Sequence, residues 1–312
     1  MAVTSDHVLW AYRILLDREP DDEGYGTQAA HFESVKELRR YFLSGAEYNA
    51  KNSGWLSDAV VICDLTKYGM DGRLYINLSD GIGLGIAQGT YERHEIEFVK
   101  SNLKAGQTFV DLGANIGLFS IIASSIVKST GKVYALEALS NNVAMLKRSI
   151  GENPFCRNVT AIRAIVADRS RGDMFIAHQP LEDGSGSSGG SFIVDGSESL
   201  PPFLRKESVQ QDTLDKLIGT KTPVHFIKMD IEGAEALAMR GAKRILTEQS
   251  PIILSEVHTD QLLAISKVNW MEYFNLMKQF GYRAHFIKNA KLDAPARDLE
   301  GGKIYNVAFV KA

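Results

Sequence analysis

Short apolar runs alternate with amphipathic segments over most of the chain after residue 107. The runs span 108–112, 132–137, 159–166, 224–229, 252–257, 282–287 and 304–310, and several are apolar nearly throughout. Strands of this kind occur in parallel sheets whose two faces are covered by helices. The segments 118–129, 141–151, 234–247 and 270–280 have the spacing of such helices. We therefore predict a doubly wound α/β domain whose last strand runs antiparallel at an edge or beside it.

The first 53 residues have a different pattern. Apolar residues recur at helical spacing over 8–16 and 35–42, with a polar turn at 18–24 between them, which predicts a small helical domain. In the connecting segment 54–106, residues 73–78 alternate like a strand, the glycine-rich stretch 81–85 predicts a turn, and 91–103 has helical periodicity. The chain thus divides into 1–53, 54–106 and 107–312.

Composition and charge argue against several classes of protein. The 35 Lys and Arg against 38 Asp and Glu give a net charge of -3, which disfavours a nucleic-acid-coating protein. Cys63 and Cys156 lie in unrelated segments without metal-ligand spacing, so we expect reduced thiols. The sequence shows no signal-peptide pattern and no apolar run long enough for a bilayer. We expect a cytoplasmic protein with no nucleic-acid partner and no membrane span.

A glycine-rich turn, D-L-G-A-N-I-G at 111–117, follows the first strand of the α/β domain. Gly113 allows a tight turn off the strand, and Gly117 allows close approach at the start of the next helix. The second strand ends on Glu137, about twenty residues later, where a carboxylate can reach both hydroxyls of a ribose. Together these features predict a nucleoside-containing cofactor beyond the carboxyl ends of the strands.

Asn115 indicates which cofactor this is. A dinucleotide-binding turn has glycine at that position, because the pyrophosphate needs close backbone approach. S-adenosylmethionine has no phosphate, and its amino acid end suits polar side chains such as Asp111 and Asn115, so we predict S-adenosylmethionine. Asp168, after the third strand, is a candidate partner of the adenine amino group and equally a simple turn residue.

Three carboxylates and an imidazole lie at or just after the carboxyl ends of the next two strands, at Asp230, Glu232, Glu256 and His258. Methyl transfer to a hydroxyl needs a general base, for which these groups are candidates. Two mechanisms stay open: direct proton removal by His258 or Asp230, or a divalent cation bound by Asp230 with Glu256 or His258. Structural roles also stay open, with Asp230 as a helix cap, the two glutamates binding amides or a lysine, and His258 as a turn residue.

With these motifs the sequence resembles the FkbM family of methyltransferases from about residue 91 to 310. The matching pieces are Tyr91-Glu92, 110–120, Q-D-T-L-D at 211–215, K-M-D-I-E-G-A-E at 228–235, Gly241-Ala242 and S-E-V-H at 255–258. The resemblance implies a class I methyltransferase fold with a mostly parallel seven-stranded sheet, with Tyr91, Glu92 and Asp230 contributing to the cofactor site. It also implies O-methylation of sugars, glycans or natural products, as in polysaccharide biosynthesis. The family more often has a proline just after the acid at Glu137, but the acid itself is retained.

The remaining segments leave several alternatives open. Residues 12–24 and 44–48 are similar to a small helical domain of unknown function in bacterial surface-associated proteins, and this unit is a candidate contact in a homo-oligomer. The Gly/Ser-rich segment 183–191 predicts a surface loop or a mobile cover over the substrate. We expect 81–93 and 184–202 to line the acceptor pocket. A non-catalytic scaffold protein is the alternative function, and Asn115 disfavours a third, an NAD-dependent oxidoreductase.

Overall fold

The structure is a computed structural model that describes residues 3–16, 18–20, 29–44, 47, 60–170, 172–180, 188–194, 196–197 and 199–311. Parts of the segments 18–24, 44–48 and 183–191 therefore lie outside the described residues. The described residues fall into two units, one before residue 60 and one from residue 60 onward. Within the described residues, no helix is long and apolar enough to cross a membrane.

The first unit is helical, as the spacing of its apolar residues predicts. It consists of α1 (Ser5–Leu15), the 3-10 turn η1 (Ala29–His31) and α3 (Val35–Ser44). Val8 and Tyr12 of α1 pack against Leu38 and Phe42 of α3, with the rings of Tyr12 and Phe42 4.9 Å apart. Thr4 caps α1, because its side chain accepts a hydrogen bond from the next turn of backbone.

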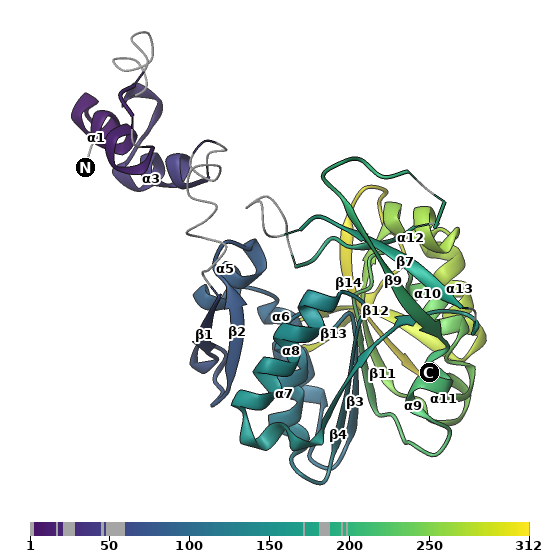
Figure 1. Cartoon of the computed structure of the whole chain (residues 1–312). Coiled ribbons are helices and arrows are strands. Elements are labelled where there is room, and N and C mark those ends of the chain that lie inside the picture. Colours follow the sequence, from purple (N-terminus) through teal and green to yellow (C-terminus); the bar gives the residue numbers. More distant parts are fainter. Residues whose placement is uncertain are drawn as a thin grey trace. The chain divides into compact units, whose positions relative to one another are not determined.

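The second unit is built on an eight-stranded sheet (Figure 1). Its strands, in spatial order, are β13 (Lys291–Pro295), β12 (Tyr282–Lys288), β14 (Ile304–Lys311), β11 (Ile252–His258), β10 (Phe226–Met229), β3 (Thr108–Leu112), β4 (Lys132–Glu137) and β5 (Val159–Arg163). The strands from β11 to β5 are parallel, and β14 runs antiparallel between β11 and β12. The prediction of a mostly parallel sheet with an antiparallel last strand is confirmed; β13, which pairs with β12, is additional.

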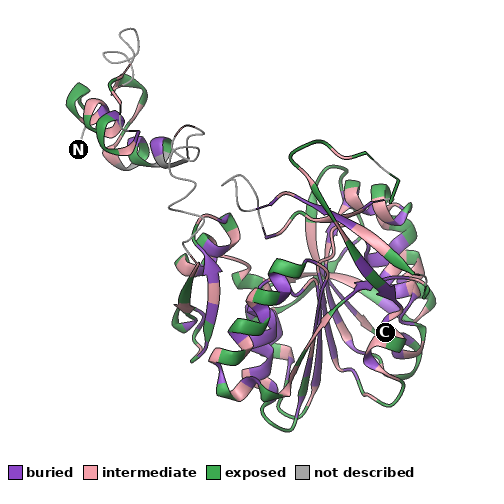
Figure 2. Ribbon diagram, viewed as in Figure 1, coloured by how far each residue is buried: buried purple, intermediate pink, exposed green. Residues whose placement is uncertain are grey.

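Helices cover both faces of this sheet (Figure 1). One face carries α6 (Arg93–Asn102), α7 (Leu118–Val127) and α8 (Ser140–Glu152), and the other carries α9 (Leu214–Ile218), α10 (Glu235–Arg240), α11 (Lys243–Glu248), α12 (Thr259–Ser266) and α13 (Trp270–Gln279). Neighbouring strand residues serve opposite faces: Phe109 and Phe226 stack in the core under α6 and α7, while Val110 and Ile227 join the other core. The central strands are accordingly buried along their length (Figure 2).

Smaller elements surround the sheet. β1 (Val60–Asp64) and β2 (Arg73–Asn77) form an antiparallel pair joined through the 3-10 turn η2 (Thr66–Tyr68). The predicted strand at 159–166 is in fact two, because β5 stays in the main sheet while β6 (Ile165–Val166) pairs with β9 (Arg205–Asp212). In this second sheet β9 also pairs with β7 (Asp173–His178), which pairs in turn with β8 (Phe192–Val194). The 3-10 helix η3 (Pro154–Asn158) precedes β5. The single helix expected at 234–247 is likewise divided into α10 and α11.

The prediction of a turn at 81–85 is wrong, because these residues begin the helix α5 (Gly81–Gln88). The Asp80 side chain caps it by accepting the N–H of Ile82, and Ile86 packs into the core. A Cβ on Gly83 would lie 2.1 Å from the carbonyl oxygen of Asn77. Glycine at this position therefore permits close packing of the helix against the end of β2, rather than a turn.

Candidate active site

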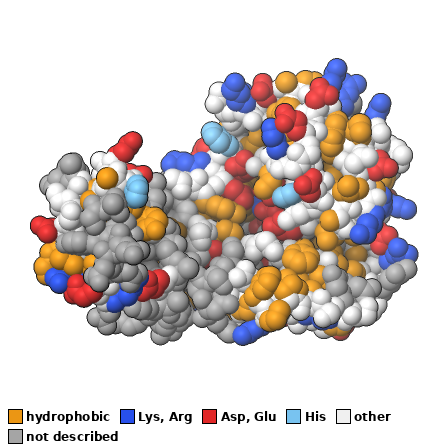
Figure 3. Space-filling view, turned by 90° about the horizontal axis from the view of Figure 1, so that it is seen from above, with side chains coloured by type: hydrophobic (Ala, Val, Ile, Leu, Met, Phe, Trp, Pro, Cys, Tyr) orange, Lys and Arg blue, Asp and Glu red, His pale blue; other side chains and the backbone are white. Residues whose placement is uncertain are grey.

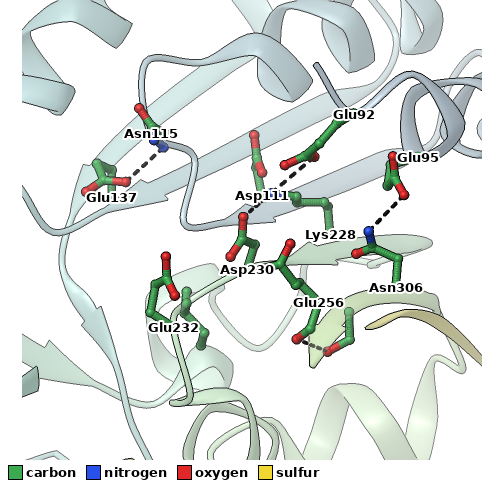
Figure 4. Close-up of polar contacts among 12 residues, drawn as sticks. Glu92, Glu95, Asp111, Asn115, Glu137, Lys228, Asp230, Glu232, Glu256 and Asn306 are labelled. Carbon is green, nitrogen blue, oxygen red and sulfur yellow. Dashed lines mark hydrogen bonds and ion pairs between the residues drawn. The ribbon is translucent and has the colours of Figure 1, made fainter. Parts of the chain in front are cut away.

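The strand register brings charged side chains to one face of the sheet at its carboxyl edge. Asp111 of β3 is the register partner of Lys228 of β10, and Glu256 of β11 pairs with Asn306 of β14. Side chains two residues apart on a strand share a face, so Asp230 follows Lys228 on this side. Figure 4 shows these residues gathered with Glu92, from the start of α6. Five elements thus supply one polar cluster.

The predicted cofactor turn leaves β3 at this edge and closes tightly over β10. Gly113 has φ +76°, and a Cβ there would lie 1.8 Å from the carbonyl oxygen of Asp230. Asn115 also adopts a positive φ, of 50°, a conformation that asparagine tolerates better than most residues. Its backbone N–H donates to Glu137 Oε2 at 2.8 Å. The turn is therefore fixed to the ends of both β10 and β4.

Glu137, the predicted ribose ligand, is held by backbone N–H groups. It accepts hydrogen bonds from Asn115, Ala138 and Leu139 at 2.8, 2.9 and 2.8 Å. Burial raises the pKa of Glu137, and these N–H groups act in the opposite direction. A carboxylate has about four acceptor positions, so about one remains for a ligand hydroxyl.

Lys228 is the centre of the charged cluster. Its Nζ lies 3.2 Å from Asp230 Oδ2 and 4.0 Å from Glu92 Oε2, and 4.8 Å from the ring centroid of Phe119. Burial lowers the pKa of Lys228, but Glu92, Asp230 and Asp111 outweigh it and hold that pKa well above its usual value. Sequence reasoning did not select Lys228, although a charged residue inside an otherwise apolar strand could have drawn attention to it.

Glu92 and Glu256 bring further carboxylates to the cluster. One oxygen from each of Glu92, Asp230 and Glu256 lies within 4.8 Å of the other two. Burial, reinforced by Asp230, raises the pKa of Glu256 to about 9; burial also raises that of Glu92 to about 7, although Lys228 opposes the rise. The neighbouring Tyr91 hydroxyl has a raised pKa as well, mainly through burial.

The other predicted site residues have different polar partners, although Glu232 is close enough to help raise the pKa of Glu256. Glu232 accepts a hydrogen bond from the backbone N–H of Gly190 at 3.0 Å and lies to one side in Figure 4. The Nδ1 of His258 accepts the N–H of Gln261 at 3.4 Å and caps α12. Asp168 pairs with its neighbour Arg169 at 3.0 Å.

Asp230 has a different local role from the helix cap that the sequence left open. Its carboxylate pairs with Lys228, while the first turn before α10 is held by Glu235, which accepts the N–H groups of Ile231 and Gly233. Asp230 therefore does not cap the helix, and its side chain faces the site.

Two pockets meet at Gly113 and Asp230, which line both of them. The apolar pocket is lined by Leu136, Glu137, Ala138, Ile165, Val166, Ile176, Ile193 and Ile231, among others. The charged pocket is lined by residues that include Tyr91, Glu92, Asn115, Phe119 and Lys228. In the view from above, acidic side chains gather in the middle of this face (Figure 3). A ligand with an apolar end and a charged end can therefore extend across the turn.

A short strap, residues 188–191, crosses the cofactor turn. The carbonyl of Ser188 accepts Nδ2 of Asn115 at 3.1 Å and Nδ2 of Asn142 at 2.8 Å, while its N–H and hydroxyl bond to Asp80. Ser191 lines the apolar pocket. Asn142 and Asp80 are thus site residues that the sequence did not reveal, because their partner lies far along the chain.

The sequence matches the model of the methyltransferase FkbM domain over residues 111–284, more than half of the chain. The matched region includes the cofactor turn, Glu137, Lys228, Asp230 and Glu256. The chain belongs to the FkbM family of S-adenosylmethionine-dependent methyltransferases. The resemblance expected from the sequence motifs is confirmed, and so is the class I methyltransferase fold, since the main sheet without β13 has seven strands in the order expected of a doubly wound domain.

Several solved structures are similar to the chain in fold. An FkbM methyltransferase from Methylobacillus flagellatus is 15% identical with a TM-score of 0.43; the match covers 96% of this chain and 58% of that protein, so the chain spans less than two thirds of its relative. Fibrillarin from Aeropyrum pernix in complex with S-adenosylmethionine is 11% identical, with 69% and 73% coverage and a TM-score of 0.38. An O-methyltransferase from Thermotoga maritima is 13% identical, with 70% and 64% coverage and a TM-score of 0.35. No functionally curated protein shows significant similarity to the chain. The family assignment rests on the family match.

Proposed function

We propose that this chain is an S-adenosylmethionine-dependent O-methyltransferase whose acceptor is a hydroxyl of a sugar, glycan or related natural product. The observation that carries the proposal is the meeting of the apolar and charged pockets at Gly113 and Asp230. This arrangement suits a cofactor with a nucleoside at one end and a charged amino acid at the other. Asp230 lies at the junction.

The residues present fit the cofactor. Leu136, Ile165 and Ile231 offer apolar walls for adenine, and Glu137 keeps an acceptor position for a ribose hydroxyl. In the charged pocket, Asn115 Oδ1 is buried without a hydrogen-bond partner among the described residues. Such an acceptor suits an ammonium group. Bound S-adenosylmethionine would supply an electrophilic methyl group on a positively charged sulfur.

Asp230 is the best candidate for the base. It lines both pockets, and its Oδ2 lies 3.2 Å from the Lys228 ammonium. Glu256, with a pKa of about 9, is protonated at neutral pH and cannot accept a proton there. His258 is engaged as the cap of α12. We assign Asp230 the removal of the acceptor hydroxyl's proton and Lys228 the role of holding its carboxylate in place.

We infer the acceptor class from the resemblance to the family, and the side chains around Asp230 are compatible with it. The aromatic side chains Tyr91 and Phe119 line the same pocket as the carboxylates Glu92 and Asp230. Aromatic faces together with hydrogen-bonding groups suit a molecule that carries both C–H faces and several hydroxyls. The cytoplasmic location and the homo-oligomeric state remain predictions.

The test is transfer of a labelled methyl group from S-adenosylmethionine onto a panel of sugar nucleotides and glycan fragments, with NMR to locate the new methyl. We expect the label on an oxygen of at least one acceptor. Label on nitrogen or carbon would contradict O-methylation. Tight cofactor binding with transfer to no hydroxylated acceptor would contradict the proposed acceptor class.

A further inference from the structure

Three carboxylates from different elements converge beside the proposed acceptor site. Glu92 comes from the start of α6, Asp230 from the end of β10 and Glu256 from β11. Their oxygens lie within 4.8 Å of one another, close enough for one ion to contact all three. Among the described residues this is the one group of histidine, cysteine and acidic side chains with such spacing.

The carboxylates of the cluster outnumber its positively charged groups. Lys228 supplies an ammonium group, and this group interacts electrostatically with Glu92, Asp111 and Asp230. Glu256 adds a further carboxylate, which is also influenced by Lys228. Buried carboxylates at this spacing must bind protons or a cation, because several ionised groups would repel one another in a poorly solvated environment.

Unpaired oxygens indicate that a ligand is missing from this site. Glu92 Oε2 is shielded from solvent and has no hydrogen-bond partner among the described residues; its contact with Lys228 Nζ, at 4.0 Å, exceeds hydrogen-bond distance. Asp111 is 1% exposed, and its Oδ1 is likewise buried and unpaired. In native proteins, buried polar atoms nearly always have a partner such as a neighbouring side chain, water or an ion. Neutral apolar ligands cannot satisfy these oxygens.

We propose that Glu92, Asp230 and Glu256 bind one hard divalent cation of the Mg²⁺ or Mn²⁺ type. Carboxylate oxygens are the ligands that these ions prefer, and the remaining positions are open to water or to the acceptor hydroxyl. The role of the ion rests on the proposed function: it lowers the pKa of the bound acceptor hydroxyl, whose proton passes to the Asp230 oxygen that does not bind the ion. His258, which the sequence left open as a ligand, is not a member of this group.

The direct test is a Mn²⁺ titration of the full chain without S-adenosylmethionine, followed by electron paramagnetic resonance. We expect one Mn²⁺ per chain, displaced by Mg²⁺. Glu92→Gln and Glu256→Gln should each weaken binding by about tenfold or more, because each removes one ligand oxygen's charge. Glu97→Gln, on the same helix but 49% exposed and paired with Lys100, is the matched control and should bind as the wild type does.

Four results would overturn the proposal: no saturable Mn²⁺ binding up to about 1 mM, unchanged affinity in both glutamine variants, loss of affinity in the control as well, or competitive displacement of Mn²⁺ by S-adenosylmethionine. Far-UV circular dichroism shows whether each variant folds. If a variant does not fold, the test is the Mn²⁺ affinity of the wild type as a function of pH. This affinity must rise by about tenfold between about pH 6 and 8, because protons leave the carboxylates. A flat profile would then contradict the site.

Calorimetry with S-adenosylmethionine in EDTA keeps this proposal separate from the proposed function. Cofactor binding without any Mn²⁺ binding overturns the cation site alone. Mn²⁺ binding without cofactor binding contradicts the proposed methyltransferase activity and leaves the cation site supported.

Discussion

The two edges of the central sheet both carry charged side chains around a hollow, but they differ in burial. At the amino edge, the larger hollow is lined by Lys128, Lys132 and Arg157, all exposed to solvent. At the carboxyl edge, Lys228 and its carboxylate partners are largely shielded, and two carboxylates have strongly raised pKa values. The size of a pocket therefore does not show which edge of the sheet carries the candidate active site.

Burial explains why these similar residue types behave differently. Exposed charges are screened by water and salt and contribute little to one another. Charges removed from water shift their protonation and respond strongly to a ligand's charge, which is why such groups concentrate at functional sites.

The largest expected effect is at Asp230. Asp230→Asn removes the proposed base while preserving size, so methyl transfer should fall by about 10²- to 10⁴-fold, with cofactor affinity changed far less. Asp71→Asn provides the control at the amino edge, where Asp71 is exposed and lines the other hollow. The measurement is the rate of methyl transfer at saturating cofactor. If Asp230→Asn retained more than about half of the wild-type rate, Asp230 would not be the base.

Glu256 should make stability depend on pH. Its folded-state pKa of about 9 exceeds the ordinary 4.5, so ionisation favours the unfolded chain increasingly as pH rises from 4.5 toward 9. The glutamine of Glu256→Gln cannot ionise. Near pH 4.5 the variant and the wild type should have the same free energy of unfolding, and near pH 9 that of the variant should be higher by about 1 kcal/mol or more. Urea denaturation in EDTA at several pH values measures this difference. A pH-independent difference, or the same trend in the exposed variant Glu97→Gln, would contradict the burial argument.

A smaller effect is expected where the strap is held. Asn142→Ala removes the N–H that binds the Ser188 carbonyl at 2.8 Å, so S-adenosylmethionine affinity should fall by about 2- to 10-fold. The adjacent Asn141 is exposed, and Asn141→Ala is the matched control. Equal affinities in both variants would mean that the strap does not shape the cofactor site.

The smallest effect belongs to the amino edge. The double substitution Lys132→Ala with Arg157→Ala should change cofactor affinity and methyl transfer by less than about twofold, since both side chains are exposed and lie at the opposite end of the strands. Initial rates and calorimetry measure both quantities. A large loss of transfer with normal cofactor binding would place part of acceptor recognition at this edge.

The main sheet could be predicted from the sequence because its strands are continuous apolar runs separated by amphipathic helices. The second sheet could not, since β9 is mostly polar and exposes half of its residues, and the apolar run of β7 is short, at 174–177. The helix α5 was missed because glycine normally disfavours helices. Only the position of Asn77 in space shows why Gly83 is needed there.

The candidate site was predictable where its geometry depends on local sequence. The turn from Asp111 to Gly117 and the strand ends at Glu137 and Asp230 could be found from spacing alone. Lys228 and the Ser188 contacts could not, because they depend on register and on partners distant in the chain. Likewise, nothing in the sequence distinguishes Glu256, inside the cluster, from Glu232, which binds the strap instead.

Isothermal calorimetry of S-adenosylmethionine with the wild type and Glu137→Gln tests the central claim most directly. We predict one site per chain with a dissociation constant between about 1 µM and 1 mM. Glu137→Gln should weaken it by about tenfold or more, because the amide cannot accept all the hydrogen bonds that Glu137 accepts. The absence of binding at millimolar cofactor, in a folded wild-type chain, would contradict the account and favour a non-catalytic scaffold that retains the fold.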